Sequence, residues 1–295
     1  MADIITLFIS YLRYERNRSE LTMQRYERSL RDFEAFFNSK DCELTWTTVD
    51  ADIIREWVEA MMDKGNMATT VNADLSAVRA FYRFALSRKL VERDPARMVL
   101  GPKRMKSLPM FVKEREMDEL LDERKWSDSY KDVRARTIII LLYEAGLRRS
   151  ELVALDNKDV DLALRQIRVT GKGRKQRTVP FGDELEAALR QYIEVRNRMT
   201  ARQCNALFVS ENGKRISAST VYKIVRENLT LVTSIKKRSP HVLRHSFATA
   251  MLNHDAGLEN VRLLLGHESI GTTEIYTHAT FEQMKRVYKE AHPRG

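Results

Sequence analysis

A chain of 295 residues is long enough for two ordinary domains, and a hydrophobic content of 43% is typical of a chain with a folded core. No apolar run reaches the length of a membrane span, and the N-terminus lacks the basic segment and cleavage site of a signal peptide. The net charge of +10 favours a polyanionic partner, by default nucleic acid, although a basic protein can also lack such a partner.

The cysteines indicate the compartment. The chain contains two, Cys42 and Cys204, which lie far apart and show no spacing typical of metal ligands. A protein in a reducing compartment has no need of a disulfide framework. We therefore expect a cytoplasmic protein that has no disulfide and no membrane partner.

The first hundred residues carry helical patterns throughout. The N-terminal stretch MADIITLFISYLRYERN is amphipathic, and residues 21–37 repeat apolar side chains three and four apart, with Thr22 as the candidate N-cap. Residues 50–65 run to a terminating Gly65, and residues 69–90 form a further helical pattern. We predict a four-helix domain over residues 1–100.

Prolines and basic residues interrupt the helical pattern after residue 94. The stretch contains Pro95, Pro102 and Pro109, which stiffen and extend a chain segment. Its basic residues can follow a phosphate backbone, or they can belong to an ordinary solvated linker. We predict a linker over residues 101–111 and a second domain over residues 112–295.

The second domain combines helices with a small sheet. Residues 134–156 predict a helix, a break at Gly146 and a second helix that contains Glu151. The stretch RQIRVTGKGRKQRTVPFG alternates apolar and basic residues around Gly171 and Gly173, which is typical of a β-hairpin with a tight turn. Helical patterns continue through Tyr288. We therefore predict a mainly α fold with a small antiparallel β-sheet (α+β).

All six histidines follow residue 240, and a metal site is the first hypothesis that they raise. His241 and His245 are spaced as in H-E-x-x-H zinc sites, but Val242 stands where the glutamate would be and Arg244 adds a permanent positive charge. An arginine fork beside a histidine donor suits a phosphate better than a cation. We therefore predict no metal and a phosphate at His241 and Arg244, whereas His245 is expected to point to the core and bond a backbone carbonyl.

Four sequence blocks follow one another in the second domain. They are EAGLRRSEL, VTGKGRKQRTVPFG, SPHVLRHSFAT and LLGHESIGTTEIYTH, and together they resemble the motifs of the tyrosine site-specific recombinases, in particular the Xer type. The resemblance covers nearly the whole chain and implies an N-terminal helical SAM-like core-binding domain and a C-terminal catalytic domain. By position in these blocks, the implied catalytic residues are Arg148, Lys172, His241, Arg244, His267 and Tyr276.

The resemblance implies a transesterification on DNA. Tyr276 would be the nucleophile and would form a 3′-phosphotyrosyl link with release of a 5′-hydroxyl. Arg148 and Arg244 would stabilise the charge that develops on the non-bridging oxygens. No metal and no other cofactor is implied.

The resemblance also implies roles for the remaining three residues. Lys172 would protonate the leaving 5′-oxygen, and the glycines beside it would let its hairpin move. His241 would act as a proton donor or acceptor near the nucleophile, and His267 would hydrogen-bond the phosphate.

Contacts with double-stranded DNA are expected from both domains, which would form a clamp around the duplex. A basic linker would pass between them. Arg79 and Arg83 can equally lie on a solvated helix face. The candidate DNA-binding residues are Lys103, Arg104, Lys106, Thr69, Thr70, Arg79, Arg83, Arg174 and Lys175.

The C-terminal segment FEQMKRVYKEAHPRG carries apolar residues at helical spacing: Phe281, Met284, Val287 and Tyr288. The resemblance implies a tetramer, and we expect this helix to dock on a neighbouring subunit, with packing on its own domain as the alternative.

The resemblance implies the resolution of chromosome dimers at a short specific dif-like site during chromosome segregation. The partners it implies are a homo- or hetero-tetramer with a second Xer-type recombinase and an FtsK-type DNA translocase. Three alternatives remain open: an integrase of a mobile element, a type IB topoisomerase, and a DNA-binding module without catalysis.

Overall fold

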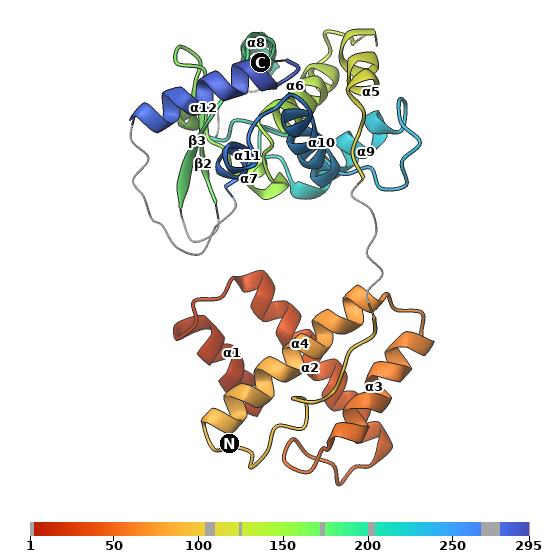
Figure 1. The fold of residues 1–295 in the computed structure, drawn as a ribbon. Coiled ribbons are helices and arrows are strands. Elements are labelled where there is room, and N and C mark those ends of the chain that lie inside the picture. The colour runs from red at the N-terminus through yellow and green to blue at the C-terminus, as the bar shows by residue number, and fades with distance from the viewer. Residues whose placement is uncertain are drawn as a thin grey trace. The chain divides into compact units, whose positions relative to one another are not determined.

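The computed structural model describes residues 3–103, 110–123, 126–171, 175–199, 204–266 and 278–294, with the backbone alone for residues 123 and 278–283. The chain divides into two compact units, Met1–Ser107 and Leu108–Gly295, which are described separately (Figure 1). Among the described helices, none is both long and apolar enough to cross a membrane.

The described residues of the first unit form four helices. They are α1 (Ile4–Tyr14), α2 (Glu20–Lys40), α3 (Ala51–Asp63) and α4 (Ala68–Ser87). The expectation that Thr22 caps α2 is wrong. Ser19 has the extended backbone of an N-cap, and its hydroxyl accepts a hydrogen bond from the Thr22 N–H at 3.3 Å, so the helix begins at Glu20.

Aromatic side chains form the core of the first unit. Phe33, Phe81 and Tyr82 are fully buried, and Trp46 lies 4.3 Å from Phe81 between ring centroids. Burial of each such side chain stabilises the unit by roughly 1.5–3 kcal/mol. The core therefore holds the four helices together without a disulfide, since Cys42 is a free, exposed cysteine.

The chain that follows α4 is fixed against that helix. Arg79 donates hydrogen bonds to the carbonyls of Ala96 and Val99, and Asn72 donates to the Pro102 carbonyl at 2.8 Å. A Cβ on Gly101 would lie 2.2 Å from the Asn72 side-chain oxygen, so only glycine permits this close approach.

The second unit surrounds a buried helix with further helices and one sheet. Its elements are α5 (Glu114–Asp118), the π-helix η1 (Glu119–Glu123), α6 (Tyr130–Glu144), α7 (Arg149–Ala154), the 3₁₀ turn η2 (Asn157–Asp159), β1 (Val160–Asp161), β2 (Gln166–Thr170), β3 (Gln176–Pro180), α8 (Asp183–Met199), α9 (Ala218–Leu229), α10 (Pro240–Asn253), α11 (Leu258–Leu265) and α12 (His278–Ala291). The helix α6 is buried along nearly its whole length, which explains its apolar run Ile138–Leu142.

The sheet has the order β1-β2-β3 with antiparallel pairing. The predicted hairpin is confirmed, with Ile167 opposite Val179 and Thr170 opposite Gln176. The two-residue strand β1 was not predicted, because it is too short to show an alternating pattern. The mainly α fold with a small antiparallel sheet is confirmed.

The C-terminal helix α12 packs on its own domain. It contacts α10 and α11, which are labelled with it in Figure 1. Met284, Tyr288 and Ala291 are buried in one cluster with Phe247 of α10 and Leu264 of α11. In this single chain the helix adopts the alternative, packing on its own domain, and docking on a neighbouring subunit stays a prediction. Its apolar face has a complementary surface within the same chain.

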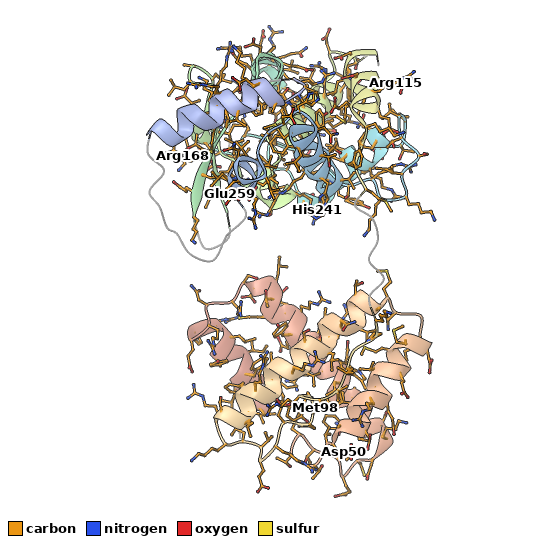
Figure 2. All side chains as sticks on the ribbon, in the orientation of Figure 1. Asp50, Met98, Arg115, Arg168, His241 and Glu259 are labelled. Atoms are coloured by element: carbon orange, nitrogen blue, oxygen red, sulfur yellow. The ribbon has the colours of Figure 1, made fainter. Side chains whose placement is uncertain are left out.

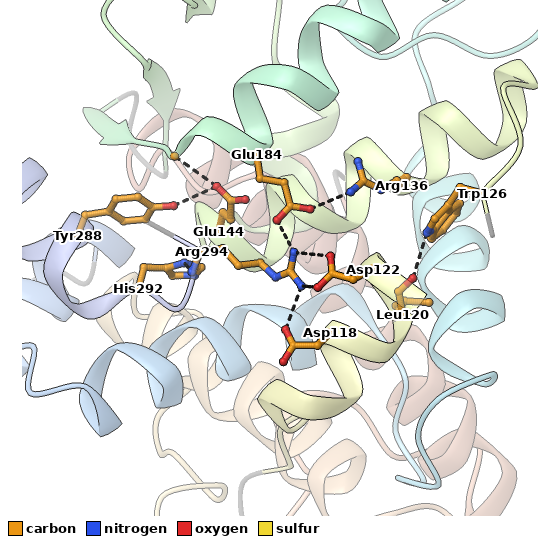
Figure 3. A network of polar contacts seen from close by, with 11 residues as sticks. Asp118, Leu120, Asp122, Trp126, Arg136, Glu144, Glu184, Tyr288, His292 and Arg294 are labelled. Atoms are coloured by element: carbon orange, nitrogen blue, oxygen red, sulfur yellow. Dashed lines mark hydrogen bonds and ion pairs between the residues drawn. The ribbon is translucent and has the colours of Figure 1, made fainter. Parts of the chain in front are cut away.

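A polar network anchors the end of α12 (Figure 3). The Tyr288 hydroxyl donates to Glu144 at 3.1 Å, and Arg294 forms ion pairs with Asp118, Asp122 and Glu184. Burial, reinforced by the nearby Glu184 carboxylate, raises the pKa of Glu144 to about 8. The protonated Glu144 therefore joins α6 to the C-terminal helix at neutral pH.

Candidate active site

Arg148 lies at the sharp break between α6 and α7. Gly146 adopts a φ of 57°, which glycine tolerates best, and this turn ends the buried helix and starts a new one. Arg148 is the N-cap residue of α7, and its backbone N–H donates to Glu151 at 2.9 Å. Its guanidinium donates to the same carboxylate at 2.7 Å and remains partly exposed. The capping interaction therefore orients the first predicted catalytic arginine.

Arg244 reaches the same place from α10. Pro240 occupies the first turn of that helix, and Arg244 lies one turn later with only 4% of its surface exposed. Its guanidinium donates to the carbonyls of Gly146 at 2.7 Å and Leu265 at 2.6 Å. Burial and the nearby Arg148 charge lower the pKa of Arg244 to about 10, so it stays cationic at neutral pH.

His241 lies at the surface at the start of α10 (Figure 2). Partial desolvation comes first among the causes that lower the pKa of His241, followed by the neighbouring His245 ring and the positive charges of Arg244 and Arg148. The ring is therefore neutral at pH 7, with one nitrogen able to donate and the other able to accept a proton.

The core position expected for His245 is wrong. His245 is exposed, and its ring lies 4.5 Å from the His241 ring between centroids. Residues four apart share a helix face, and α10 buries Val242, Leu243 and Phe247 instead. His245 therefore belongs to the surface beside the two arginines.

Sequence reasoning missed two residues that connect this cluster. Glu151 is 4% exposed, and Arg177 of β3 binds it with two parallel hydrogen bonds of 3.0 and 2.9 Å. Burial alone would raise the pKa of Glu151, but the hydrogen bonds from Arg177 and Arg148 outweigh it and hold the pKa below its usual value. The signals were the spacing of Arg148 and Glu151, which suits a cap, and the inward position of Arg177 in an alternating strand.

The end of α11 completes the arrangement. The last carbonyls of a helix lack intrahelical partners and carry partial negative charge, so they are suited to bind cations. Three successive carbonyls here each accept a hydrogen bond from a different arginine. The carbonyls of Leu264, Leu265 and Gly266 bind Arg177, Arg244 and Arg148, in that order, at 2.9, 2.6 and 3.4 Å.

Several predicted site residues lie outside the described residues: Lys172, Arg174, His267, Tyr276, Arg104 and Lys106. His267 directly follows Gly266 in the sequence, and Lys172 follows Gly171 at the end of β2. Each of these two residues is thus the next in the sequence after a residue whose position is described. The structure brings Arg148, His241 and Arg244 together.

The candidate DNA-binding residues that are described occupy different environments. Lys103, Lys175, Thr69 and Arg83 are exposed, whereas Arg79 uses its guanidinium on backbone carbonyls of its own unit. Thr70 lines a groove of about 940 Å³ between α2, α3 and α4, together with Arg25, Arg28 and Lys64.

Comparison with known proteins identifies the chain. Residues 110–283 match the phage integrase family, and residues 5–89 match the N-terminal SAM-like domain of phage integrases. The chain belongs to the phage integrase family. The predicted SAM-like domain followed by a catalytic domain is thereby confirmed.

Individual relatives agree with this assignment. The chain is 36% identical to the tyrosine recombinase XerC of Chlorobaculum tepidum, over 98% of this chain and 94% of that protein. It is 34% identical to the tyrosine recombinase XerD of Oceanobacillus iheyensis, over 98% and 97%. The prediction of an Xer-type tyrosine recombinase is confirmed, and with it an enzyme that cleaves and rejoins DNA in site-specific recombination.

Solved structures share the fold. The Tn1549 transposon integrase in complex with circular intermediate DNA gives a TM-score of 0.70 at 22% identity, over 95% of this chain and 98% of that one. The XerH recombinase bound to difH substrate gives 0.70 at 22% identity, over 96% and 84%.

Proposed function

We propose that the phenolic oxygen of Tyr276 attacks a DNA phosphodiester. The phenol loses its proton, its oxygen bonds to phosphorus and the bond from phosphorus to the 5′-oxygen breaks, which leaves a 3′-phosphotyrosyl link and a 5′-hydroxyl. Attack by a second 5′-hydroxyl reverses these steps and joins new strands. Because each displacement keeps a phosphoester bond, joining requires no ATP.

The arginine cluster beside the surface histidines supports this proposal. Arg148, Arg177 and Arg244 carry three positive charges around the single carboxylate of Glu151, so the cluster keeps an excess of positive charge. A phosphorane gains negative charge as it forms, and preorganised donors in a partly dry site stabilise it. In this proposal Arg148 and Arg244 bind the non-bridging oxygens.

The remaining groups would move or hold protons. Lys172 protonates the leaving 5′-oxygen, and His267 donates a hydrogen bond to the phosphate. His241, whose lowered pKa keeps it neutral at pH 7, accepts or donates the proton near the nucleophile.

Double-stranded DNA would be held by both units. The exposed Lys103, Lys175 and Thr69 are candidate contacts, together with Arg104, Lys106 and Arg174 in the segments outside the described residues. Contacts of basic side chains with phosphates make the affinity fall steeply with salt. In this proposal the two units clamp the duplex and the linker tracks its backbone.

The biological role we propose is resolution of chromosome dimers at a dif-like site in the cytoplasm. The chain would act as a homo- or hetero-tetramer with a second Xer-type recombinase, with an FtsK-type DNA translocase as activator. The 34–36% identity to proteins named XerC and XerD supports this role. The XerH recombinase, which shares the fold, is bound to a difH substrate in its own structure.

The test uses a nicked suicide duplex that carries a dif-like site. The unaltered protein should form a covalent adduct, and Tyr276→Phe should bind the duplex without forming one. Tyr14→Phe is the matched control, because Tyr14 is 79% exposed at the end of α1 and its variant should form the adduct normally. Binding without an adduct would leave a DNA-binding module.

The choice of site separates the remaining alternatives. A plasmid with two dif-like sites should be resolved into two circles. Relaxation of a supercoiled plasmid that lacks any site would instead indicate a topoisomerase. Recombination only between the ends of a mobile element would indicate an integrase.

A further inference from the structure

Arg177 is a buried cation with no assigned task in the reaction. It is 9% exposed, and its three guanidinium nitrogens all have partners: two bind Glu151, and Nε donates to the Leu264 carbonyl at 2.9 Å. Removing water from an arginine is costly unless its donors are satisfied. The chain therefore keeps a buried ion pair, with a high desolvation cost, on the same carboxylate that the predicted catalytic arginines approach.

Three arginines, Arg148, Arg177 and Arg244, lie within ion-pair distance of the Glu151 carboxylate. Its oxygens accept from Arg177 and from the Arg148 guanidinium and backbone N–H at 2.7–3.0 Å. Arg244 approaches Oε2 only to 3.9 Å, which is an ion pair without a hydrogen bond. Arg244 is thus close enough to be captured by this carboxylate whenever one of its present partners is lost.

We propose that Arg177 is a positioning residue for strand cleavage. Because Arg177 binds both oxygens of the Glu151 carboxylate, Arg244 and Arg148 keep N–H donors available for the scissile phosphate. This inference rests on the proposed function, because it requires those two arginines to bind the phosphate. In this proposal Arg177 acts through Glu151 and does not itself bind the phosphate.

A second contact extends the same role to the end of α11. The Arg177 side chain lies against Gly266, where a Cβ would come within 3.0 Å of its Cδ atom. Through the Leu264 carbonyl and this close contact, Arg177 sets where α11 ends. His267, a predicted phosphate ligand, is the next residue in the sequence. Loss of Arg177 should therefore also disturb the end of α11, from which the chain continues to His267.

The primary test is the single-turnover rate constant for adduct formation on the suicide duplex, with Arg177→Gln and Arg177→Lys. We expect unchanged DNA affinity and a rate constant roughly 10- to 100-fold lower for Arg177→Gln, the range below that for loss of a donor that contacts the reacting oxygen directly. Arg177→Lys keeps the charge but loses the fork, and should fall between Arg177→Gln and the unaltered protein. Unfolded protein lowers the amplitude of the reaction and leaves the rate constant unchanged.

Two further variants separate positioning from a structural role. Arg196→Gln is the matched control, because Arg196 of α8 is 3% exposed and donates to Asn157 and Leu207 at 2.7 Å. It should lower the melting temperature but leave the rate constant unchanged. Adding Glu151→Gln to Arg177→Gln should recover part of the lost rate, since a neutral amide no longer captures Arg244.

Protonation of Glu151 in Arg177→Gln should restore part of the cleavage rate, as the added Glu151→Gln substitution should. Loss of Arg177 removes the hydrogen bond and the charge that contribute most to lowering the pKa of Glu151, so this pKa should rise relative to the unaltered protein and the deficit of Arg177→Gln should shrink as the pH falls. A wild-type rate constant in Arg177→Gln and Arg177→Lys would overturn the inference, as would an equal loss in Arg196→Gln. If the unaltered protein forms no adduct that depends on Tyr276, the proposed function fails and this inference fails with it.

Discussion

Replacement of Gly266 by alanine tests how tightly the arginine cluster constrains the end of α11. Gly266 has a φ of 64°, in the left-handed region, and an added Cβ would lie 3.0–3.2 Å from three atoms of the Arg177 side chain. Gly65 after α3 has a similar φ of 80°, but an added Cβ there meets nothing within 4 Å. The two glycines therefore differ mainly in what surrounds them.

The expected costs follow from this difference. Left-handed backbone costs a residue with a Cβ roughly 1–2 kcal/mol, and this cost applies at both sites. Crowding in a packed site adds typically 1–3 kcal/mol, which applies at Gly266 alone. Gly65→Ala should therefore lower the free energy of unfolding of the first unit by about 1–2 kcal/mol, and Gly266→Ala should lower that of the second unit by about 2–5 kcal/mol.

The assay is urea unfolding followed by circular dichroism, together with single-turnover cleavage of the suicide duplex. Gly266→Ala should slow cleavage by roughly tenfold or more, because Arg177 must move and small displacements of positioned groups are costly. Gly65→Ala should cleave normally. Equal losses of stability and normal cleavage by both variants would refute the packing of Arg177 against Gly266.

Three further predictions concern the site and the C-terminal helix. Arg244→Lys replaces the guanidinium that donates to the Gly146 and Leu265 carbonyls. Cleavage of bound duplex, followed on gels of samples quenched at successive times, should slow by roughly 100-fold. A wild-type rate would count against a role of Arg244 in cleavage. The raised pKa of Glu144 means that its contribution to stability is present at low pH and is lost between about pH 4.5 and about pH 8. In urea titrations, the unaltered protein should lose about 1.4 kcal/mol per pH unit in this window from this group, and Glu144→Gln should lack that slope. Arg294→Ala removes ion pairs to α5, η1 and α8, so amide hydrogen exchange in α12 should accelerate several-fold, and an unchanged rate would exclude it as an anchor.

Periodicity was sufficient to predict the four helices of the first unit and the hairpin, because burial of one face imposes a pattern on nearby residues, whereas the short α5 and η1 were not predicted. It was insufficient for β1, where two residues show no pattern, and for the start of α2, where both Ser19 and Thr22 are good caps. Helical spacing shows that one face of α12 is apolar, without showing which surface it contacts, so it could not decide between a neighbouring subunit and the helix's own domain.

The site residues were predictable where each lies within a motif of the family. Arg148, His241 and Arg244 lie within recognisable blocks and come together in the fold. Arg177 of β3 and Glu151 of α7 are 26 residues apart in the sequence. The cap spacing and the inward strand position mark each residue separately, but neither pattern shows that the two contact each other. His245 was misjudged because a histidine beside an apolar face can be oriented either way.

The atom that joins protein to DNA decides the proposed mechanism most directly. Peptide mapping by mass spectrometry of the adduct, formed on a duplex labelled separately at each side of the nick, identifies both that residue and the strand end. We expect a single peptide that contains Tyr276, linked to a 3′-phosphate, with a free 5′-hydroxyl on the released strand. A link to any other side chain, or to a 5′-phosphate, would contradict the mechanism.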